Sequence, residues 1–241
     1  MKIDAVVPTL NLDSCYRTIE TLKGVVNNII IVESGKGFSD EQVLDDVLVF
    51  QRKDQLSFGD ACRIGVEQSD ADRILLINDD AFATPGAVDY MKQSKAPIVG
   101  ARLVYPDGRI QHGGGSFLPH GAPYHLFRGL PGEFEPAYKT YPCLWVTFAA
   151  TLVDRALWDE LEGFDPLYRN GFEDVDFCLR AREAGYLVEY VGLALFIHEE
   201  STTLNRLELS QENNWRNFQE RWVTAGRLQK VFTAYKELAL W

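Results

Sequence analysis

The sequence lacks the features that mark membrane, secreted and repeat proteins. Its 241 residues include only four cysteines, which lie far apart, with no Cys-x-x-Cys pair. This spacing gives neither a disulfide framework nor a zinc finger. No apolar run approaches the roughly 18–20 residues of a spanning helix, and no basic segment followed by an apolar run resembles a signal peptide. We therefore expect a cytoplasmic protein with reduced thiols and no transmembrane segment.

Basic residues are also scarce. The 24 lysines and arginines are outnumbered by 35 aspartates and glutamates, which gives a net charge of −11. An acidic surface repels phosphate backbones and anionic bilayers, so we expect no binding to nucleic acid and none to membrane surfaces. Apolar residues at 46% and charged residues at 24% are ordinary for a folded protein with a sizeable core.

Short apolar runs alternate with segments of helical spacing through the first hundred residues. Nearly continuous apolar runs are typical of strands covered by helices on both faces. Strands are predicted at 3–7, 28–32, 47–50, 73–77 and 97–99, and helices at 16–22, at 61–68 and from Pro85 onward. This order predicts an α/β domain with a mainly parallel central sheet and right-handed crossovers.

The second half of the chain has a different pattern. Residues 103–140 are rich in glycine and proline, which predicts a hairpin at Pro106-Asp107-Gly108 followed by long loops. Further predicted elements are strands at 144–153 and 187–191 and helices at 155–161 and 174–184. From residue 207 aromatic residues recur at helical steps, which predicts a C-terminal amphipathic helix.

Two carboxylates follow the predicted strand 73–77, in Asn78-Asp79-Asp80. They would lie at the carboxyl edge of the sheet, where open α/β folds bind ligands. Carboxylate oxygens there favour a hard cation such as Mg²⁺ or Mn²⁺. A solvated turn or a helix cap explains the pair equally well when it is taken alone.

A second acidic cluster contains Glu173, Asp174 and Asp176 at the start of a predicted helix. Acids at a helix N-terminus are stabilised by free N–H groups and by the helix dipole, and for Asp176 alone this is the better explanation. Three acids in four residues exceed what capping requires. The cluster could supply the positioned base that deprotonates a sugar hydroxyl.

Other candidates lie at the ends of predicted strands. His198 follows an apolar run and could complete a metal site, although a strand-end histidine with a hydrogen-bonded ring is the commoner case. Pro8-Thr9 and Glu33 follow the first two strands. They could line a nucleotide pocket on the same edge as Asp79, or be ordinary loop residues.

Several other motifs are incomplete. His112-Gly113-Gly114-Gly115 is similar to an esterase oxyanion loop, but the sequence has no G-x-S-x-G nucleophile elbow. Gly35-x-Gly37 lacks the third glycine of a dinucleotide fingerprint, and position 202 lacks the second histidine of a zinc protease. The glycine- and lysine-rich loop of a sugar nucleotidyltransferase is absent after the first strand.

Several motifs do occur together, in one order, over roughly residues 3–200. They are Val6-Val7-Pro8-Thr9-Leu10-Asn11, Ile29-Ile30-Ile31-Val32-Glu33-Ser34-Gly35, Phe58-Gly59-Asp60-Ala61 with Gly65, Leu75-Leu76-Ile77-Asn78-Asp79-Asp80, Gly163-Phe164-Asp165 and Glu173-Asp174-Val175-Asp176-Phe177-Cys178-Leu179-Arg180 with Gly185-Tyr186. This ordered set resembles family 2 glycosyltransferases of the rhamnosyltransferase type. The resemblance implies a single Rossmann-like, glycosyltransferase A-type domain that binds a nucleotide-diphosphate sugar and a divalent metal.

The resemblance also implies roles for particular residues. Asn78-Asp79-Asp80 stands where the family has its metal-binding D-x-D, with Asp80 as the ligand and Asp79 near the donor ribose or sugar. Glu173-Asp174 matches the catalytic E-D pair, with Asp174 as the base. The other residues implied in nucleotide binding are Pro8, Thr9, Glu33 and Arg63. The sequence departs from the family pattern at Asn78, which is an amide, and at Glu33, where aspartate is commoner.

The expected function is therefore that of an inverting glycosyltransferase that uses Mg²⁺ or Mn²⁺, held by Asp80 and His198. It would move a hexose or deoxyhexose from a UDP- or dTDP-linked donor to a hydroxyl acceptor in glycan or polysaccharide synthesis. Residues 1–206 would form the catalytic domain, with a nucleotide-binding half at 1–100 and an acceptor-binding half at 101–206. Trp145 and Tyr168 are candidate stacking platforms for sugar rings, although aromatic residues of this kind are more often core residues.

Three questions stay open at the level of sequence. The amide at Asn78 motivates an alternative, a non-catalytic carbohydrate- or nucleotide-binding subunit with the same fold. A transferase that acts on modified nucleobases in DNA is a remoter possibility, which the net charge disfavours. For residues 207–241, packing onto the catalytic domain is the expectation, with a homodimer interface as the main alternative.

Overall fold

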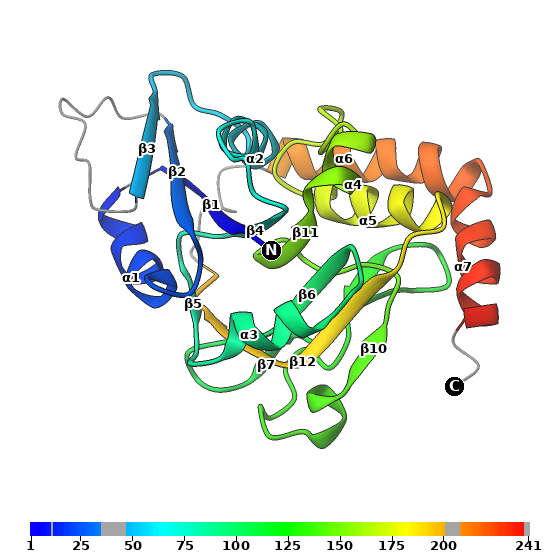
Figure 1. Cartoon of the computed structure of the whole chain (residues 1–241). Helices are drawn as coiled ribbons and strands as arrows, with labels where there is room; N and C mark the ends of the chain where they lie inside the picture. The colour runs from blue at the N-terminus through cyan, green and yellow to red at the C-terminus, as the bar shows by residue number, and fades with distance from the viewer. Residues whose placement is uncertain (11, 35–46, 201–207, 239–241) are drawn as a thin grey trace.

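A ten-stranded mixed sheet runs through the centre of the protein (Figure 1). The structure is a computed structural model, and it describes residues 1–10, 12–34, 47–200 and 208–238. The strands are β1 (Ile3–Thr9), β2 (Asn28–Ser34), β3 (Val47–Arg52), β4 (Arg73–Ile77), β5 (Ala81–Ala83), β6 (Ile98–Val104), β7 (Ile110–His112), β8 (Gly115–Phe117), β9 (Pro123–His125), β10 (Thr140–Pro142), β11 (Ala150–Asp154) and β12 (Val188–His198). The helices are α1 (Leu12–Leu22), α2 (Phe58–Glu67), α3 (Ala87–Gln93), α4 (Arg155–Glu160), α5 (Glu173–Glu183), α6 (Glu208–Phe218) and α7 (Arg227–Leu238).

The strand order is β10-β12-β6-β11-β4-β1-β2-β3, with β5 added to β12 and β7 added to β6. The pairs β1–β2, β2–β3, β1–β4 and β6–β12 are parallel, so the expected α/β fold with a mainly parallel core is confirmed. β11 runs antiparallel between β4 and β6 and joins the two halves of the sheet. β8 and β9 form a separate two-stranded sheet.

Helices cover both faces of the sheet, as the apolar strands predict. α1 and α3 pack on one face, and α2, α4 and α5 pack on the other (Figure 1). Neighbouring residues of one strand serve opposite faces, so Val6 lies in one core and Val7 in the other. On α2, a Cβ at Gly65 would meet the side chain of Val6 at 2.4 Å, so only glycine permits this close helix–strand approach.

Several predicted boundaries differ from the structure, and three of the differences have a clear physical cause. The strand expected at 144–153 is only β11, because the buried residues before it cross toward β8, where Gly115 bridges to Trp145. The strand expected at 187–191 continues to His198 as the single strand β12, which has an irregularity between Val191 and Leu195. The helix expected from Pro85 starts at Ala87, since Gly86 takes a left-handed conformation with φ of 81°.

The C-terminal segment forms two helices instead of the single amphipathic helix expected over 207–241. A π-helical stretch, Gln219–Thr224, follows α6, and Gly226 with φ of 69° separates it from α7. This segment packs back onto the domain, as expected. Its buried core residues are Phe218, Trp222, Leu228 and Val231. The division into a catalytic domain and a tail, and the homodimer, remain predictions.

Candidate active site

The ends of β1 and β4 bring two predicted residues together. The two strands are parallel neighbours, and the Thr9 hydroxyl at the end of β1 donates a hydrogen bond of 2.6 Å to Asp79 Oδ2 just after β4. The Asp79 carbonyl accepts a second bond of 2.8 Å from the Thr18 hydroxyl on α1. These contacts fix the turn that presents Asp80.

Asp80 and His198 lie side by side because β5 turns back onto the end of β12. His198 pairs with Ala81 in this antiparallel ladder, which places Asp80 next to the imidazole. His198 Nε2 lies 3.0 Å from Asp80 Oδ1, and both residues are only 7% exposed. The pairing that the chemistry of His198 suggested is therefore present, although residues 81–83 gave no strand signal.

Two further contacts define the His198 ring. Nδ1 lies 2.6 Å from Gln111 Oε1, and Nε2 lies 3.1 Å from Asn78 Nδ2. A carbonyl oxygen only accepts, so Gln111 Oε1 assigns a proton to Nδ1, and the Asn78 NH₂ group, which only donates, assigns a lone pair to Nε2. In this assignment Nε2 and Asp80 Oδ1 face each other at 3.0 Å as two acceptors, an arrangement that a cation bound between them would stabilise. Asn78, the amide at the first acid position, thus donates to the ring.

Asp80 and His198 fit a divalent cation. Their facing oxygen and nitrogen are 3.0 Å apart, close to the roughly 3 Å between adjacent ligands of an octahedron with bonds of about 2.1 Å. A carboxylate suits both Mg²⁺ and Mn²⁺, and a neutral imidazole is a common ligand of transition-metal ions, so a site with both favours Mn²⁺. Within the described ranges no group of three or more His, Cys, Asp or Glu side chains forms a metal site. Substrate oxygens and water would have to complete the coordination.

Glu173 and Asp174 open α5. The preceding Phe172 has a left-handed backbone with φ of 71°, which turns the chain sharply into the helix. The Glu173 carboxylate accepts a hydrogen bond from the Gly171 N–H and is 6% exposed. Burial, and then the charge of Asp174, raise the pKa of Glu173 well above its ordinary value.

The Asp174 carboxyl group faces the segment before β11. It accepts hydrogen bonds from the Val175 N–H at 2.8 Å, from the Phe148 N–H and from the Thr147 hydroxyl. Burial raises the pKa of Asp174 to about 6, against the lowering effect of these hydrogen bonds. A carboxylate with this pKa is ionised at neutral pH and is a stronger base than an exposed one.

A short segment connects the two acidic centres. Thr147 and Phe148 bind Asp174, and the carbonyl of the next residue, Ala149, accepts a 3.0 Å hydrogen bond from the Asn78 N–H. Asp174 and the residues that follow β4 therefore lie on either side of residues 147–149. This connection could not be expected from the sequence, where 144–153 has only a strand pattern.

Two histidines, His112 and His125, form a pair next to Thr147. His112 Nε2 accepts a long hydrogen bond of 3.4 Å from the Thr147 N–H, and His112 Nδ1 is 2.8 Å from His125 Nδ1. Burial lowers the pKa of His112 well below its ordinary value, and it lowers the pKa of His125 to about 4. Both rings are therefore neutral near pH 7, and His112 contacts the Thr147 backbone directly.

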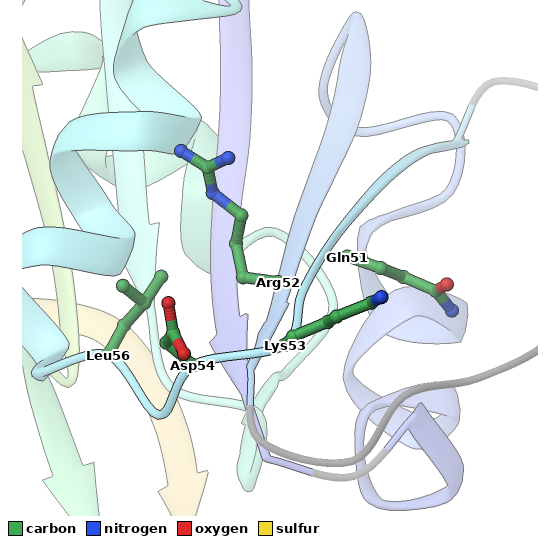
Figure 2. Close-up of a pocket in the computed structure, with 5 residues that line it drawn as sticks. All are labelled: Gln51, Arg52, Lys53, Asp54 and Leu56. Atoms are coloured by element: carbon green, nitrogen blue, oxygen red, sulfur yellow. The ribbon is translucent and has the colours of Figure 1, made fainter.

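Glu33, near the end of β2, contacts Gln51, one of the residues that line a pocket. It is 1% exposed, and its Oε2 accepts a 3.2 Å hydrogen bond from Gln51 Nε2 on β3. Its Oε1 has no hydrogen-bond partner among the described residues, and burial raises its pKa. Figure 2 shows the adjoining pocket, which is lined by Gln51, Arg52, Lys53, Asp54 and Leu56.

The remaining predicted residues have different surroundings. Pro8 is half-buried in β1, opposite Val32. Arg63 lies on α2 and donates a 2.9 Å hydrogen bond to the Phe164 carbonyl. Trp145 and Tyr168 are only 2% exposed, so the expectation that they present ring faces to sugars is wrong.

No protein-family model matches the chain. Three curated relatives match in sequence. A protein of Sinorhizobium fredii known as uncharacterized protein y4gI is 32% identical over 157 residues, or 57% of this chain and 16% of the relative. O-antigen biosynthesis protein RfbC of Myxococcus xanthus is 27% identical over 162 residues, which cover 63% of this chain and 13% of the relative. N-acetylglucosaminyl-diphospho-decaprenol L-rhamnosyltransferase of Mycobacterium tuberculosis is 26% identical over 155 residues, which cover 56% of this chain and 49% of the relative. The chain therefore spans about half the length of these relatives, or less.

Solved structures extend the similarity over more of the chain. GalNAc-T7 with UDP, GalNAc and Mn²⁺ superposes with a TM-score of 0.68 at 12% identity, covering 92% of this chain and 48% of that one. The chain has the glycosyltransferase A-type fold. TarS 1–349 of S. aureus in complex with UDP gives a TM-score of 0.57 at 13% identity. The superposition covers 82% of this chain and 60% of TarS 1–349. The expected resemblance to family 2 glycosyltransferases is confirmed.

In this glycosyltransferase A-type fold, some of the residues around the site gave no signal in the sequence. Gln111, His112 and His125 belong to a segment whose glycines and prolines predicted a hairpin and loops, and Thr147 belongs to a segment that predicted only a strand. Helices long and apolar enough to cross a membrane do not occur in the part of the chain that the structure describes.

Proposed function

We propose that this protein is an inverting, metal-dependent glycosyltransferase that moves a sugar from a nucleotide-diphosphate donor to a hydroxyl acceptor in polysaccharide synthesis. The main support is one arrangement, in which residues 147–149 lie between the Asp174 carboxylate and the Asn78 backbone next to Asp80 and His198. The names of the Myxococcus and Mycobacterium relatives favour glycan synthesis. The nucleotide in the solved GalNAc-T7 and TarS structures favours a UDP-linked donor, with a dTDP-linked donor as the alternative.

Asp174 would act as the general base. The acceptor oxygen attacks the anomeric carbon on the side opposite the leaving group, the new C–O bond forms as the bond to the diphosphate breaks, and the acceptor proton passes to the Asp174 carboxylate. The hydrogen bonds from Thr147, Phe148 and Val175 hold this carboxylate in one orientation. Glu173, with its raised pKa, would be protonated near neutral pH and would add no second charge beside the base.

Asp80 Oδ1 and His198 Nε2 would hold Mg²⁺ or Mn²⁺, which when bound neutralises charge on the departing diphosphate. Thr9 would keep Asp79 oriented toward the donor ribose or sugar. The Glu33 carboxyl group, which is hydrogen-bonded to Gln51 of the pocket in Figure 2, would contact the nucleobase. Pro8 and Arg63 remain predicted nucleotide contacts. Holding donor and acceptor in line would supply much of the rate.

Isothermal titration with UDP, with and without Mn²⁺, tests the donor and metal assignments. We expect binding that depends on Mn²⁺ and that is abolished by Asp80→Asn. It should be retained in Asp159→Asn, which changes an exposed aspartate on α4. UDP affinity that is indifferent to both EDTA and Asp80→Asn would contradict the metal assignment.

Turnover of a panel of UDP- and dTDP-sugars tests the reaction itself. Hydrolysis or transfer from one donor, with inversion at the anomeric carbon, is the expected result. Donor binding without turnover of any donor, over a panel of hydroxyl acceptors, would favour the non-catalytic binding subunit.

A further inference from the structure

Gln111 is a buried residue of β7 with two polar partners. It is 3% exposed, its Oε1 lies 2.6 Å from His198 Nδ1, and its Nε2 donates a 3.3 Å hydrogen bond to Glu200 Oε2. β7 pairs with β6, with Ile110 opposite Val104, so the backbone that presents the amide belongs to the central sheet.

Glu200 determines which way the Gln111 amide faces. An ionised carboxylate only accepts hydrogen bonds, so the NH₂ group of Gln111 must point toward Glu200 and the carbonyl oxygen toward His198. Arg128 holds the same carboxylate by hydrogen bonds of 3.0 and 3.1 Å. The hydrogen bonds of these four side chains therefore converge on Glu200: Arg128 donates to it directly, and His198 donates to Gln111, which in turn donates to it.

We propose that Gln111 is a positioning residue that keeps His198 in the Nδ1–H tautomer and so prepares a divalent-cation site with Asp80. The inference rests on the metal part of the proposed function. Gln111 Oε1 accepts the Nδ1 proton, which leaves the Nε2 lone pair directed at the Asp80 side. A partner that fixes the ring of a ligating histidine is a common feature of metal sites in proteins.

The consequence of losing Gln111 follows from the same distances. Without an acceptor at Nδ1, the ring can carry its proton on Nε2 and donate it to Asp80 Oδ1, 3.0 Å away. That hydrogen bond would engage both metal-binding atoms at once. The cation would then have to break it and restore the other tautomer, so binding would weaken.

The first measurement uses the unmodified protein. A long-range ¹H–¹⁵N spectrum of the imidazole groups, with the His198 signals identified by their loss in His198→Asn, is expected to show His198 as the Nδ1–H tautomer in the absence of metal. A ring protonated on Nε2 would overturn the proposal, whether or not any variant folds.

The second measurement is Mn²⁺ binding, followed by electron paramagnetic resonance in the presence of UDP. Gln111→Leu is expected to weaken Mn²⁺ binding by roughly 10–100-fold and to move the His198 proton to Nε2. Arg128→Gln, which removes another partner of Glu200 but keeps the Gln111–His198 contact, is the matched control and is expected to bind Mn²⁺ like the unmodified protein.

The outcomes separate two failures. If Gln111→Leu binds Mn²⁺ as tightly as the unmodified protein, the positioning role is wrong and the proposed function is unaffected. If the unmodified protein binds no Mn²⁺ even with UDP, the metal assignment itself is wrong.

Discussion

The indole N–H of Trp222 donates a 2.8 Å hydrogen bond to Asp176 Oδ1, and both side chains are completely buried. Asp176 also pairs with Arg180 at 2.7 Å and with Arg221 at 3.3 Å. Asp176 follows Asp174 by two residues on α5. The C-terminal segment therefore contacts, through Trp222 and Arg221, the helix that positions the proposed base. Two arginines and an indole around one carboxylate go well beyond helix capping, the explanation that the sequence favoured for Asp176.

A second contact of the same segment holds the loop before α5. The Asn214 side chain, on α6, donates to the carbonyls of Arg169 and Gly171 at 2.9 Å each. These residues precede the left-handed turn at Phe172. The C-terminal helices therefore help to set the direction in which α5 begins.

Trp222→Phe should destabilise the protein. The change removes a hydrogen bond to a buried charge and part of a buried ring, and we expect the free energy of unfolding to fall by about 2–4 kcal/mol. Urea denaturation measures this loss. Trp215→Phe is the matched control, because Trp215 belongs to the same segment and contributes ring contacts with Phe172 and Phe218. Equal losses in the two variants would show that the hydrogen bond from Trp222 to Asp176 does not contribute measurably to the free energy of unfolding.

Asp174→Asn should separate binding from chemistry. An amide cannot take the acceptor proton, so we expect turnover to fall by roughly 10²–10⁴-fold while the dissociation constant for the donor changes little. Steady-state kinetics and titration calorimetry measure the two quantities, with Asp159→Asn on α4 as the control. Turnover equal to that of the unmodified protein would contradict the assignment of Asp174 as the base.

Thr147→Val should shift the pH profile. The base must be ionised, so kcat/KM is expected to rise to a plateau as the pH rises through about 6, the pKa of Asp174. The Thr147 hydroxyl lowers that pKa, so its removal should move the acid limb to higher pH. Thr233→Val, at an exposed position on α7, is the control and should leave the profile unchanged. If the acid limb of the Thr147→Val profile stays at the same pH, the hydrogen bond from Thr147 to Asp174 is contradicted.

Glu173→Gln should change how stability depends on pH. The folded-state pKa of Glu173 is raised to about 8, above the ordinary value near 4, so the buried neutral carboxyl stabilises the fold fully below pH 4. That contribution is lost as the pH rises to 8, at up to about 1.4 kcal/mol per pH unit. The unmodified protein should therefore lose stability relative to Glu173→Gln over this window. Denaturation at several pH values measures the difference in the free energy of unfolding, with the exposed Glu67→Gln as control. If the unmodified protein and Glu173→Gln depend on pH in the same way, Glu173 is ionised in the folded protein.

The parallel strands of the fold could be predicted because each is a short apolar run ending at a turn. β4 lies at 73–77, as expected, and the ends of β1 and β4 meet as parallel order requires. β5 could not be predicted, because three residues are too few to show a periodicity, and they become a strand only by pairing with β12. The path of residues 144–149 was missed because apolar residues that pack against β8 have the same pattern as strand residues.

The acids of the site could be found in the sequence, but their partners could not. Asp80 and His198 are separated by more than a hundred residues and meet only through the β5–β12 ladder. Gln111 and His112 lie in a segment where glycine and proline dominate the pattern. A single amide or imidazole has no spacing signal, so its role depends on tertiary contacts such as the bond from Gln111 to His198.

Removal of the C-terminal helices should unfold the protein. A version ending at residue 206 loses four buried core residues: Phe218, Trp222, Leu228 and Val231. At roughly 1.5–3 kcal/mol for each, the loss of about 6–12 kcal/mol is comparable with the whole stability of a typical domain.

Light scattering and circular dichroism on this truncated version, beside one ending at residue 238, test the expectation. The short version should aggregate, because Asp176 is left buried without Trp222 and Arg221 and the apolar face of α5 is exposed. The longer version should be folded, since it keeps every described residue. A folded, monomeric short version derived from a dimeric parent would instead establish the homodimer interface, because side chains that a monomer can lose without unfolding belong to a contact between chains and not to its core.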